Sequence, residues 1–305
     1  MFSHTYKTPF LLALITAISV AQFSMAEPVT DQATPTVGII PNASEAEAGK
    51  GSLLLTPGRI VLEGKERTAE ITLANNGSGP ADFRISLENK RMKEDGSILP
   101  AGETQEGDMF ADQMIRFAPK KVRLEPGKSQ TILVSVRKPR DLPDGEYRTH
   151  MKFMLIPEHK PETEGGPVDD DKNVSISIQA NIGITIPIIV RQGKLDATVT
   201  MDKLALGHDE SGKPTIEFSL NRTGGASTYG DLAIQYVNKS GKTVLLRKLS
   251  GAAVYTPITI RTFKFPLDLP NNLKLSDMTA LKVSFVTHAN NDELGDVLAS
   301  QQIKL

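Results

Sequence analysis

One stretch of alternating residues, Val174 to Ile188, constrains the fold of this chain more than any other feature. It reads VSISIQANIGITIPI, and every second residue is apolar. Successive side chains of a strand point to opposite faces, so this period of two predicts a β-strand with one apolar and one polar face. At about 3.3 Å per residue the stretch would reach about 50 Å, well beyond a usual strand of about 5–6 residues. We expect part of it to be offered to another protein; an ordinary edge or core strand of its own domain is the alternative.

Composition restricts the classes of protein that the chain can belong to. Its 305 residues are enough for two domains, and its formal charge of −1 gives no general attraction to nucleic acid or to an anionic membrane. A locally basic stretch, Lys120 to Arg140, has few aromatic residues interleaved with it, so nucleic-acid binding is not expected. The chain has no Cys, which excludes disulfides, thiolate metal sites and cysteine nucleophiles.

The N-terminal segment has the features of an export signal. Lys7 precedes an apolar run from Phe10 to Val20, and the small-x-small ending Ser24-Met25-Ala26 follows it. We therefore predict a signal peptide over residues 1–26 and a periplasmic product without a membrane anchor; an uncleaved N-terminal anchor is the alternative. Residues 27–50 are polar and aperiodic, which predicts a flexible leader, with a tether or regulatory arm as the alternative.

From residue 51 the sequence consists of short alternating runs separated by turn signals. Turns are predicted at Asn75–Pro80 and Glu125–Lys128, and polar loops at 93–108 and 158–173. A second series of such runs follows residues 191–193, with one short helical turn at 271–278. This spacing predicts an all-β chain of two immunoglobulin-like β-sandwich domains, covering residues 51–190 and 191–305.

Motifs that carry chemistry are missing from the sequence. The five His have neither metal-ligand spacing nor an HExxH context, and no GxSxG, Walker or dinucleotide-binding motif occurs. The run Asp169 to Asp171 lacks the ordered spacing of a calcium loop, so a solvated charge run is expected. We predict that the protein is not an enzyme and needs neither a cofactor nor a metal ion.

The segment from Met114 to Ile156 resembles the PapD-like periplasmic chaperones of pilus assembly. The family pattern of Arg, Pro, Leu-x-Pro-Gly-x-Ser-Gln and Leu-Pro-x-Gly-Glu-Tyr-Arg is met at Arg116, Pro119, Leu124, Pro126, Gly127, Ser129, Gln130, Leu142, Pro143, Gly145, Glu146, Tyr147 and Arg148. The upstream run LTPGRIVLEGKERTAEITLANNG is similar to the opening strands of the family. The resemblance covers residues 51–191, and the second half of the chain is similar only in texture.

The resemblance implies two domains in a boomerang arrangement and a chaperone that binds pilus subunits by β-augmentation, lending them a strand. It implies an outer-membrane usher as a further partner, and a homo-oligomer that covers the donor strand when no subunit is bound. The implied donor-strand residues are Val174, Ile176, Ile178, Ala180, Ile182, Ile184 and Ile186. Side chains alternate between the two faces of a strand, so a shift of the strand pairing by one residue would turn every Ile of the donor strand toward water. The pairing register between donor strand and subunit therefore sets specificity.

The resemblance also implies two charged sites. Arg59 falls where the family holds the carboxylate of the subunit; a solvated strand Arg is the alternative. The partner Lys of the family is missing from this donor strand, and Gly183 takes its place in the comparison. The interdomain salt bridge of the family carries over to Glu146, Arg191 and Asp292.

A structural pilus subunit or surface adhesin of two sandwich domains is the competing interpretation. Such a subunit would carry its donor strand as an N-terminal extension, whereas residues 27–50 do not alternate. The chaperone is therefore the favoured hypothesis.

Overall fold

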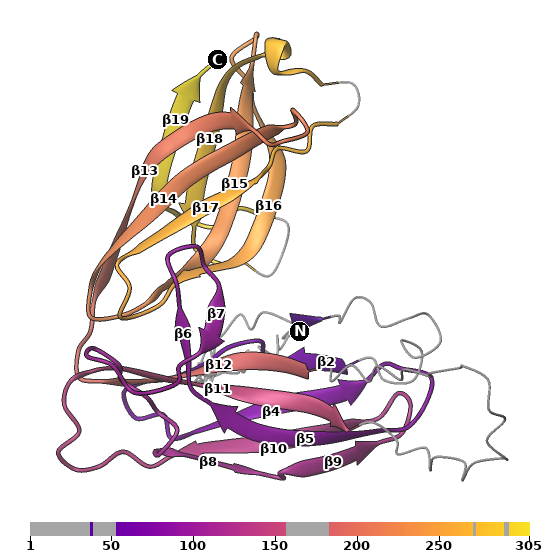
Figure 1. The fold of residues 1–305 in the computed structure, drawn as a ribbon, viewed down its shortest axis with the longest axis vertical. Coiled ribbons are helices and arrows are strands. Elements are labelled where there is room, and N and C mark those ends of the chain that lie inside the picture. Colours follow the sequence, from indigo (N-terminus) through magenta and orange to yellow (C-terminus); the bar gives the residue numbers. More distant parts are fainter. Residues whose placement is uncertain (1–36, 39–52, 157–182, 271–272, 290–292) are drawn as a thin grey trace, which may run out of the picture. The chain divides into compact units, whose positions relative to one another are not determined.

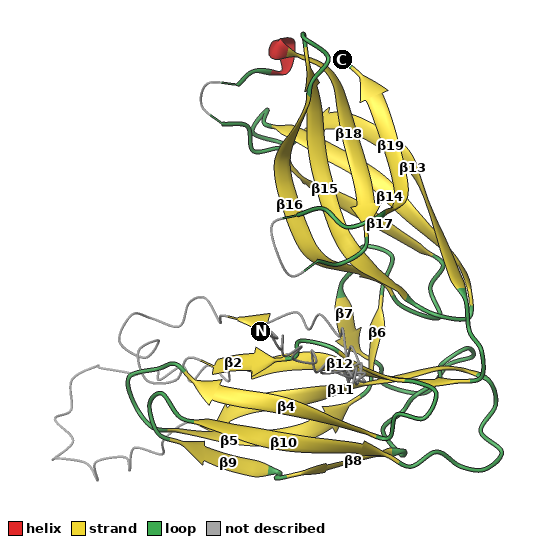
Figure 2. Cartoon of the chain, turned by 180° about the vertical axis from the view of Figure 1, so that it is seen from behind, coloured by secondary structure: helices red, strands yellow, loops and turns green. Residues whose placement is uncertain are grey.

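The structure is a computed structural model that describes residues 37–38, 53–156, 183–270, 273–289 and 293–305. These residues are almost entirely β-strand, as Figure 2 shows in yellow, and their one helical element is the 3₁₀ turn Leu275–Asp277. In the described part of the chain no helix is long and apolar enough to cross a membrane. The predicted all-β fold is confirmed.

The first sandwich consists of two five-stranded sheets (Figure 1). One sheet has the order β1-β2-β4-β10-β8, with strands Val37–Gly38, Leu53–Thr56, Thr68–Asn75, Ser129–Val136 and Ile115–Ala118. The other has the order β3-β12-β11-β5-β9, with strands Ile60–Leu62, Gly183–Gln192, Gly145–Ile156, Ala81–Glu88 and Lys121–Leu124. The inner faces of both sheets form one apolar core.

Local sequence explains the strands of this first sandwich. In β10 the alternating residues Ile132, Val134 and Val136 are buried and the residues between them are not. The turn predicted at Glu125–Lys128 forms, with the Lys128 amide donating to the Glu125 carbonyl at 3.0 Å. Gly127 adopts φ +69° there, a left-handed conformation that suits Gly.

The polar loop predicted at 93–108 is partly wrong, because the structure forms a hairpin there. Strand β6, Lys90–Met92, pairs with β7, Ile98–Pro100. The turn contains Gly96 at φ +83°, whose amide donates to the Lys93 carbonyl at 2.8 Å. Each strand has only three residues, and the apolar residues of β7, Ile98 and Leu99, are adjacent, so no period of two shows in the sequence.

The second sandwich follows after residue 192. Its three-stranded sheet has the order β13-β14-β17, with strands Ala197–His208, Pro214–Gly224 and Ile260–Pro266. Its four-stranded sheet has the order β16-β15-β18-β19, with strands Thr243–Val254, Thr228–Asn238, Met278–Val286 and Val297–Lys304. A separate apolar core lies between these two sheets, and it includes the stacked rings of Phe218 and Phe263.

Several sequence-based predictions fall outside the described residues. The signal peptide 1–26 does so entirely, and so do Val174 to Ile182 of the long strand. Of the leader, only Val37 and Gly38 are described; they form β1 and pair with Leu55 and Leu54 of β2.

Candidate functional site

Strand β12 contains the described part of the alternating stretch. Ile186 and Ile188 are fully buried in the core of the first sandwich, and Ile184 is partly buried against it. In the described part of the stretch, the even-numbered residues therefore point to the inner face of the sheet. Because Ile186 lies inside its own core, it is not exposed to a partner; Ile184 stands at the border of that core.

One edge of β12 is open over half of its length. On one side β12 pairs with β11 from Gly183 to Gln192, but on the other side β3 pairs only with Ile188, Ile189 and Val190. Among the described residues, the backbone of Gly183 to Pro187 has no strand on that second side. Such an edge presents unpaired N–H and C=O groups to which another strand can add.

Arg59 stands at the closed end of this edge. It comes directly before Ile60, which is in register with Ile188, so Pro187 is the β12 residue beside it. Gly183, the residue that takes the place of the family's Lys in the sequence comparison, lies four residues earlier in β12 and is not beside Arg59. Arg59 is partly buried, with its guanidinium 4.6 Å from the ring centroid of Tyr229. It has no ion pair or hydrogen bond to any described residue, and its Nε is buried without a partner.

Glu146 and Arg191 form an ion pair between the paired strands β11 and β12. Arg191 Nε donates to Glu146 Oε2 at 3.1 Å, and Arg191 Nη1 donates to Glu63 Oε2 at 3.0 Å. Glu146 is 1% exposed and also accepts hydrogen bonds from the backbone amide and the hydroxyl of Ser227. It therefore joins the first sandwich to the second. Asp292, the third expected member of this site, lies outside the described residues.

The outer face of β11 is the face that points away from the core of the first sandwich, and Glu146 belongs to it. Two further residues of this face, Arg148 and His150, are also buried. Arg148 is 6% exposed; it donates to the Thr256 carbonyl at 3.0 Å and lies 4.5 Å from the ring centroid of Tyr255. His150 is 2% exposed, and neither ring nitrogen has a hydrogen-bond partner among the described residues. Burial, reinforced by the charges of Arg148 and Lys90, lowers the pKa of His150 to about 3, so its ring is neutral.

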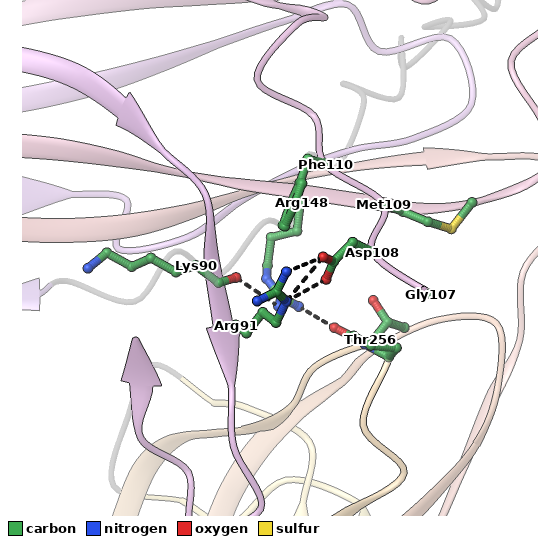
Figure 3. A pocket seen from close by; sticks show the side chains of 9 residues that line it. Lys90, Arg91, Gly107, Asp108, Met109, Phe110, Arg148 and Thr256 are labelled. Atoms are coloured by element: carbon green, nitrogen blue, oxygen red, sulfur yellow. Dashed lines mark hydrogen bonds and ion pairs between the residues drawn. The ribbon is translucent and has the colours of Figure 1, made fainter. Parts of the chain in front are cut away.

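A small polar pocket lies next to Arg148 (Figure 3). Arg91 Nε donates to Asp108 Oδ1 at 2.8 Å, and Arg91 also binds the carbonyls of Ala101 and Glu103. This hydrogen bond holds the pKa of the Asp108 carboxyl below its ordinary value. Arg91 and Asp108 neutralise each other, and they connect the β6–β7 hairpin to the loop that precedes β8.

A second buried carboxylate, Asp231, organises the second sandwich. His288 Nδ1 lies 2.7 Å from Asp231 Oδ1, Lys248 Nζ lies 3.3 Å from Asp231 Oδ2, and the amide of Gly251 donates to it at 3.1 Å. Burial would raise the pKa of Asp231, but the hydrogen bonds from His288 and from backbone amides outweigh burial and lower it. Three chain segments are thereby held together. No group of acidic, His or Cys side chains in the described residues is arranged to hold a metal ion.

Sequence reasoning missed three residues at the outer face of the sheet that contains β3, β12 and β11. Tyr229 and Tyr255 come from the second sandwich, and no local pattern connects them to Arg59 or Arg148. His150 alternates with core residues and so looks like a solvated strand residue. Only the burial of this face, which depends on long-range packing, distinguishes it.

Comparison with known proteins gives distant structural likenesses. No protein-family model matches the chain, and no curated protein matches it either. One similar structure is the CsuC–CsuE chaperone–tip subunit pre-assembly complex from archaic chaperone-usher Csu pili of Acinetobacter baumannii. It matches with a TM-score of 0.41 at 12% identity, covering 83% of this chain and 97% of that chain. This likeness is one of fold.

Two more solved structures give the same result. The Salmonella enterica SafA pilin in complex with the SafB chaperone matches with a TM-score of 0.39 at 16% identity, covering 88% of this chain and 100% of that chain. The Pseudomonas aeruginosa CupB2 chaperone matches with a TM-score of 0.38 at 12% identity, covering 82% and 98%. At this distance the likenesses assign no residue a role.

Proposed function

We propose that this protein is a periplasmic chaperone of pilus assembly that binds pilus subunits by lending them a β-strand. It is exported by the signal peptide 1–26, acts with an outer-membrane usher and has no catalytic role. When no subunit is bound, a second copy of the chain covers the donor strand. The observation that carries the proposal is the open edge of β12 over Gly183 to Pro187, together with the apolar alternation that precedes it.

The alternation before β12 has the same phase as the core residues within β12. Val174, Ile176, Ile178, Ala180 and Ile182 share the even numbering of Ile184, Ile186 and Ile188, which face the core of the first sandwich. Strand β11, as described, ends at Ile156, two residues beyond its last pair with β12 at Met154 and Gly183. An extended segment over 174–180 would therefore carry its apolar face past its own sheet. A subunit that lacks a strand can bury that face, and each Ile contributes about 1.5–3 kcal/mol.

The open edge also sets where an added strand must stop. A strand that pairs with Gly183 to Pro187 meets β3 at the level of Arg59. Its last residue therefore comes to lie beside a guanidinium that has no acidic partner among the described residues. A terminal carboxylate accepts two hydrogen bonds from such a group, so Arg59 is proposed as the anchor for the C-terminus of the subunit.

The test is co-purification with the pilus subunits encoded beside this gene, using two matched variants. Ile178→Asp places a charge on the apolar face of the donor segment, and Ser177→Asp places the same charge on its polar face. We expect Ile178→Asp to abolish capture of the subunit and Ser177→Asp to leave it within about twofold, because only the first buries a charge. Equal capture by both variants would refute the donor-strand mechanism. Recovery of the protein in sheared pili instead of the periplasm would favour a structural subunit.

A further inference from the structure

The β6–β7 hairpin extends from the first sandwich and also contacts the second. At its tip the Glu94 carbonyl accepts a hydrogen bond from the amide of Thr262 in β17 at 2.7 Å. Among the described residues β17 is an edge strand with β14 on one side, so Glu94 supplies an acceptor on the other side. Below the tip, Met92 is 5% exposed and packs with Ala253 and Tyr255 of the second sandwich. The hairpin is therefore an element of contact between the sandwiches.

The tip of the hairpin lies against Arg261 of β17, and position 96 has to be Gly for this contact. Gly96 has φ +83°, and a Cβ at this position would clash with the Arg261 guanidinium. That guanidinium is held in place, because its Nη1 donates to the Ala253 carbonyl at 2.8 Å and its Cζ lies 4.4 Å from the ring centroid of Phe263. Arg261 therefore cannot make room for a Cβ without losing contacts of its own.

The base of the hairpin is tied firmly to the first sandwich. Arg91 Nε donates to Asp108 Oδ1 at 2.8 Å (Figure 3). The amide of Ala101 donates to the Asn89 carbonyl at 2.9 Å, and Asn89 Oδ1 accepts a hydrogen bond from Thr149 Oγ1 of β11 at 2.8 Å. Because the base is fixed in this way, a restraint at the tip acts on the whole first sandwich.

The hairpin begins far from the covalent link between the sandwiches, which comprises residues 193–196. The link follows Gln192, which is in register with Gly145 of β11, whereas the hairpin follows Glu88, which is in register with His150 of β11. Five residues along β11 span about 17 Å, and the two strand spacings from β12 to β5 span about 10 Å. The link and the base of the hairpin are therefore about 20 Å apart.

This separation gives the hairpin a leverage that the other contacts lack. Glu146, which accepts hydrogen bonds from Ser227, is next to Gly145 and so lies beside the link. Arg148, which donates to the Thr256 carbonyl, stands between the link and the hairpin. A contact at a pivot restrains rotation little, whereas a contact about 20 Å from it restrains rotation strongly.

We propose that the β6–β7 hairpin is a strut that fixes the angle between the two sandwiches, and that Gly96 is the residue that permits its contact. Domains joined by one link move relative to each other unless a large apolar interface holds them. The apolar cluster between these sandwiches is small, with Met92, Ile189, Ala253 and Tyr255 as its buried members in the described part of the chain. The strut supplies the second point of attachment. This proposal does not depend on the proposed chaperone function.

The test is a distance measurement by pulsed electron spin resonance on the full chain, with one spin label on each sandwich. The chain has no Cys, so labels attach only where one is introduced. Leu133→Cys on β10 is paired with Leu245→Cys on β16 in one sample and with Leu298→Cys on β19 in another; all three side chains are exposed. A rotation that one pair does not detect changes the distance in the other.

Two Gly variants form the matched comparison. Gly96→Ala and Gly102→Ala both place Ala at a positive φ, +83° and +61°, but a Cβ at Gly102 has no atom within 4 Å. We expect Gly96→Ala to broaden the distance distribution about twofold in at least one label pair, and Gly102→Ala to leave both distributions unchanged. Circular dichroism checks that each variant is folded.

Thr262→Pro breaks the same contact from the other side and leaves the sequence of the hairpin intact. Pro has no N–H to donate to Glu94, and an edge strand tolerates Pro where the N–H points away from its sheet. We expect the broadening seen in Gly96→Ala. An unchanged distribution in folded Thr262→Pro, or equal distributions in Gly96→Ala and Gly102→Ala, would overturn the strut. A distribution that is already broad before either contact is changed would overturn it as well.

Discussion

The two faces of strand β11 follow different rules although they belong to one strand. The inner face presents Met151 and Phe153, which are fully buried in an apolar core. The outer face presents Glu146, Arg148 and His150, which are nearly as buried but lie among charges and aromatic rings. Burial on the inner face is driven by the hydrophobic effect, whereas burial on the outer face requires a partner for every charge. Equal burial therefore does not mean equal chemistry: apolar packing fills one face, and ion pairs, hydrogen bonds and ring contacts fill the other.

The largest effect is expected on the inner face. Phe153→Ala should lower the free energy of unfolding by about 3–5 kcal/mol, because it opens a cavity in the core of the first sandwich. Denaturant titration followed by circular dichroism measures the loss. Leu133→Ala, at a side chain that is 50% exposed, is the control and should cost below about 1 kcal/mol. Equal losses at both positions would mean that the inner face is not the core.

A smaller effect is expected at the junction on the outer face. Glu146→Ala should lower the free energy of unfolding by about 2–3 kcal/mol, because the amide of Ser227 and the Nε of Arg191 lose their acceptor. Calorimetry of this variant beside Glu70→Ala, at an exposed position of β4, checks the claim. If the two variants are equally stable, Glu146 does not join the sandwiches in solution.

The pH dependence of stability distinguishes the two faces further. The pKa of His150 is about 3 in the folded protein and about 6.5 in the unfolded chain, so below pH 6.5 only the unfolded chain is protonated there. Stability is therefore lost as pH falls from 6.5 toward 3, by about 1.4 kcal/mol per pH unit from this residue.

Denaturant titrations between pH 7 and pH 4.5 measure this slope. His150→Gln should make the slope shallower, whereas Leu133→Ala, at an exposed position without a titrating group, should not change it. An unaltered slope in His150→Gln would show that the ring is not held neutral.

The smallest effect is expected for an exposed ion pair. Arg123 Nη1 lies 2.7 Å from Asp82 Oδ2, but the two side chains are 56% and 39% exposed. Breaking it by Arg123→Ala should change the free energy of unfolding by at most about 1 kcal/mol, and the effect should vanish at high salt. A loss as large as that of Glu146→Ala would contradict the distinction between buried and exposed charge.

The inner face could be predicted from the sequence, and the outer face could not. Period-two alternation at Ile132, Val134 and Val136 marks core residues directly, because strand geometry converts sequence order into sidedness. His150 and Arg148 follow the same alternation as polar residues and so resemble a solvated face. Arg148 is covered by residues more than 100 positions away, Tyr255 and Thr256, and no local period records that packing.

Arg59 shows the same limit. Its motif predicted a binding role, but its neighbour in the sheet depends on the parallel pairing of β3 with β12, which joins segments more than 120 residues apart. The resemblance pointed to Gly183 as the residue in place of the family's Lys, whereas the register places Pro187 beside Arg59. The β6–β7 hairpin was missed for the opposite reason, because its strands are too short for any period to show.

The most direct test of the central claim is hydrogen exchange on the free protein and on its complex with a pilus subunit. If the open edge of β12 pairs with the subunit, the amides of residues 174–186 should exchange at least tenfold more slowly in the complex, while those of β8 at an edge of the other sheet stay unchanged. Protection that appears elsewhere in the chain, with residues 174–186 unaffected, would contradict the account.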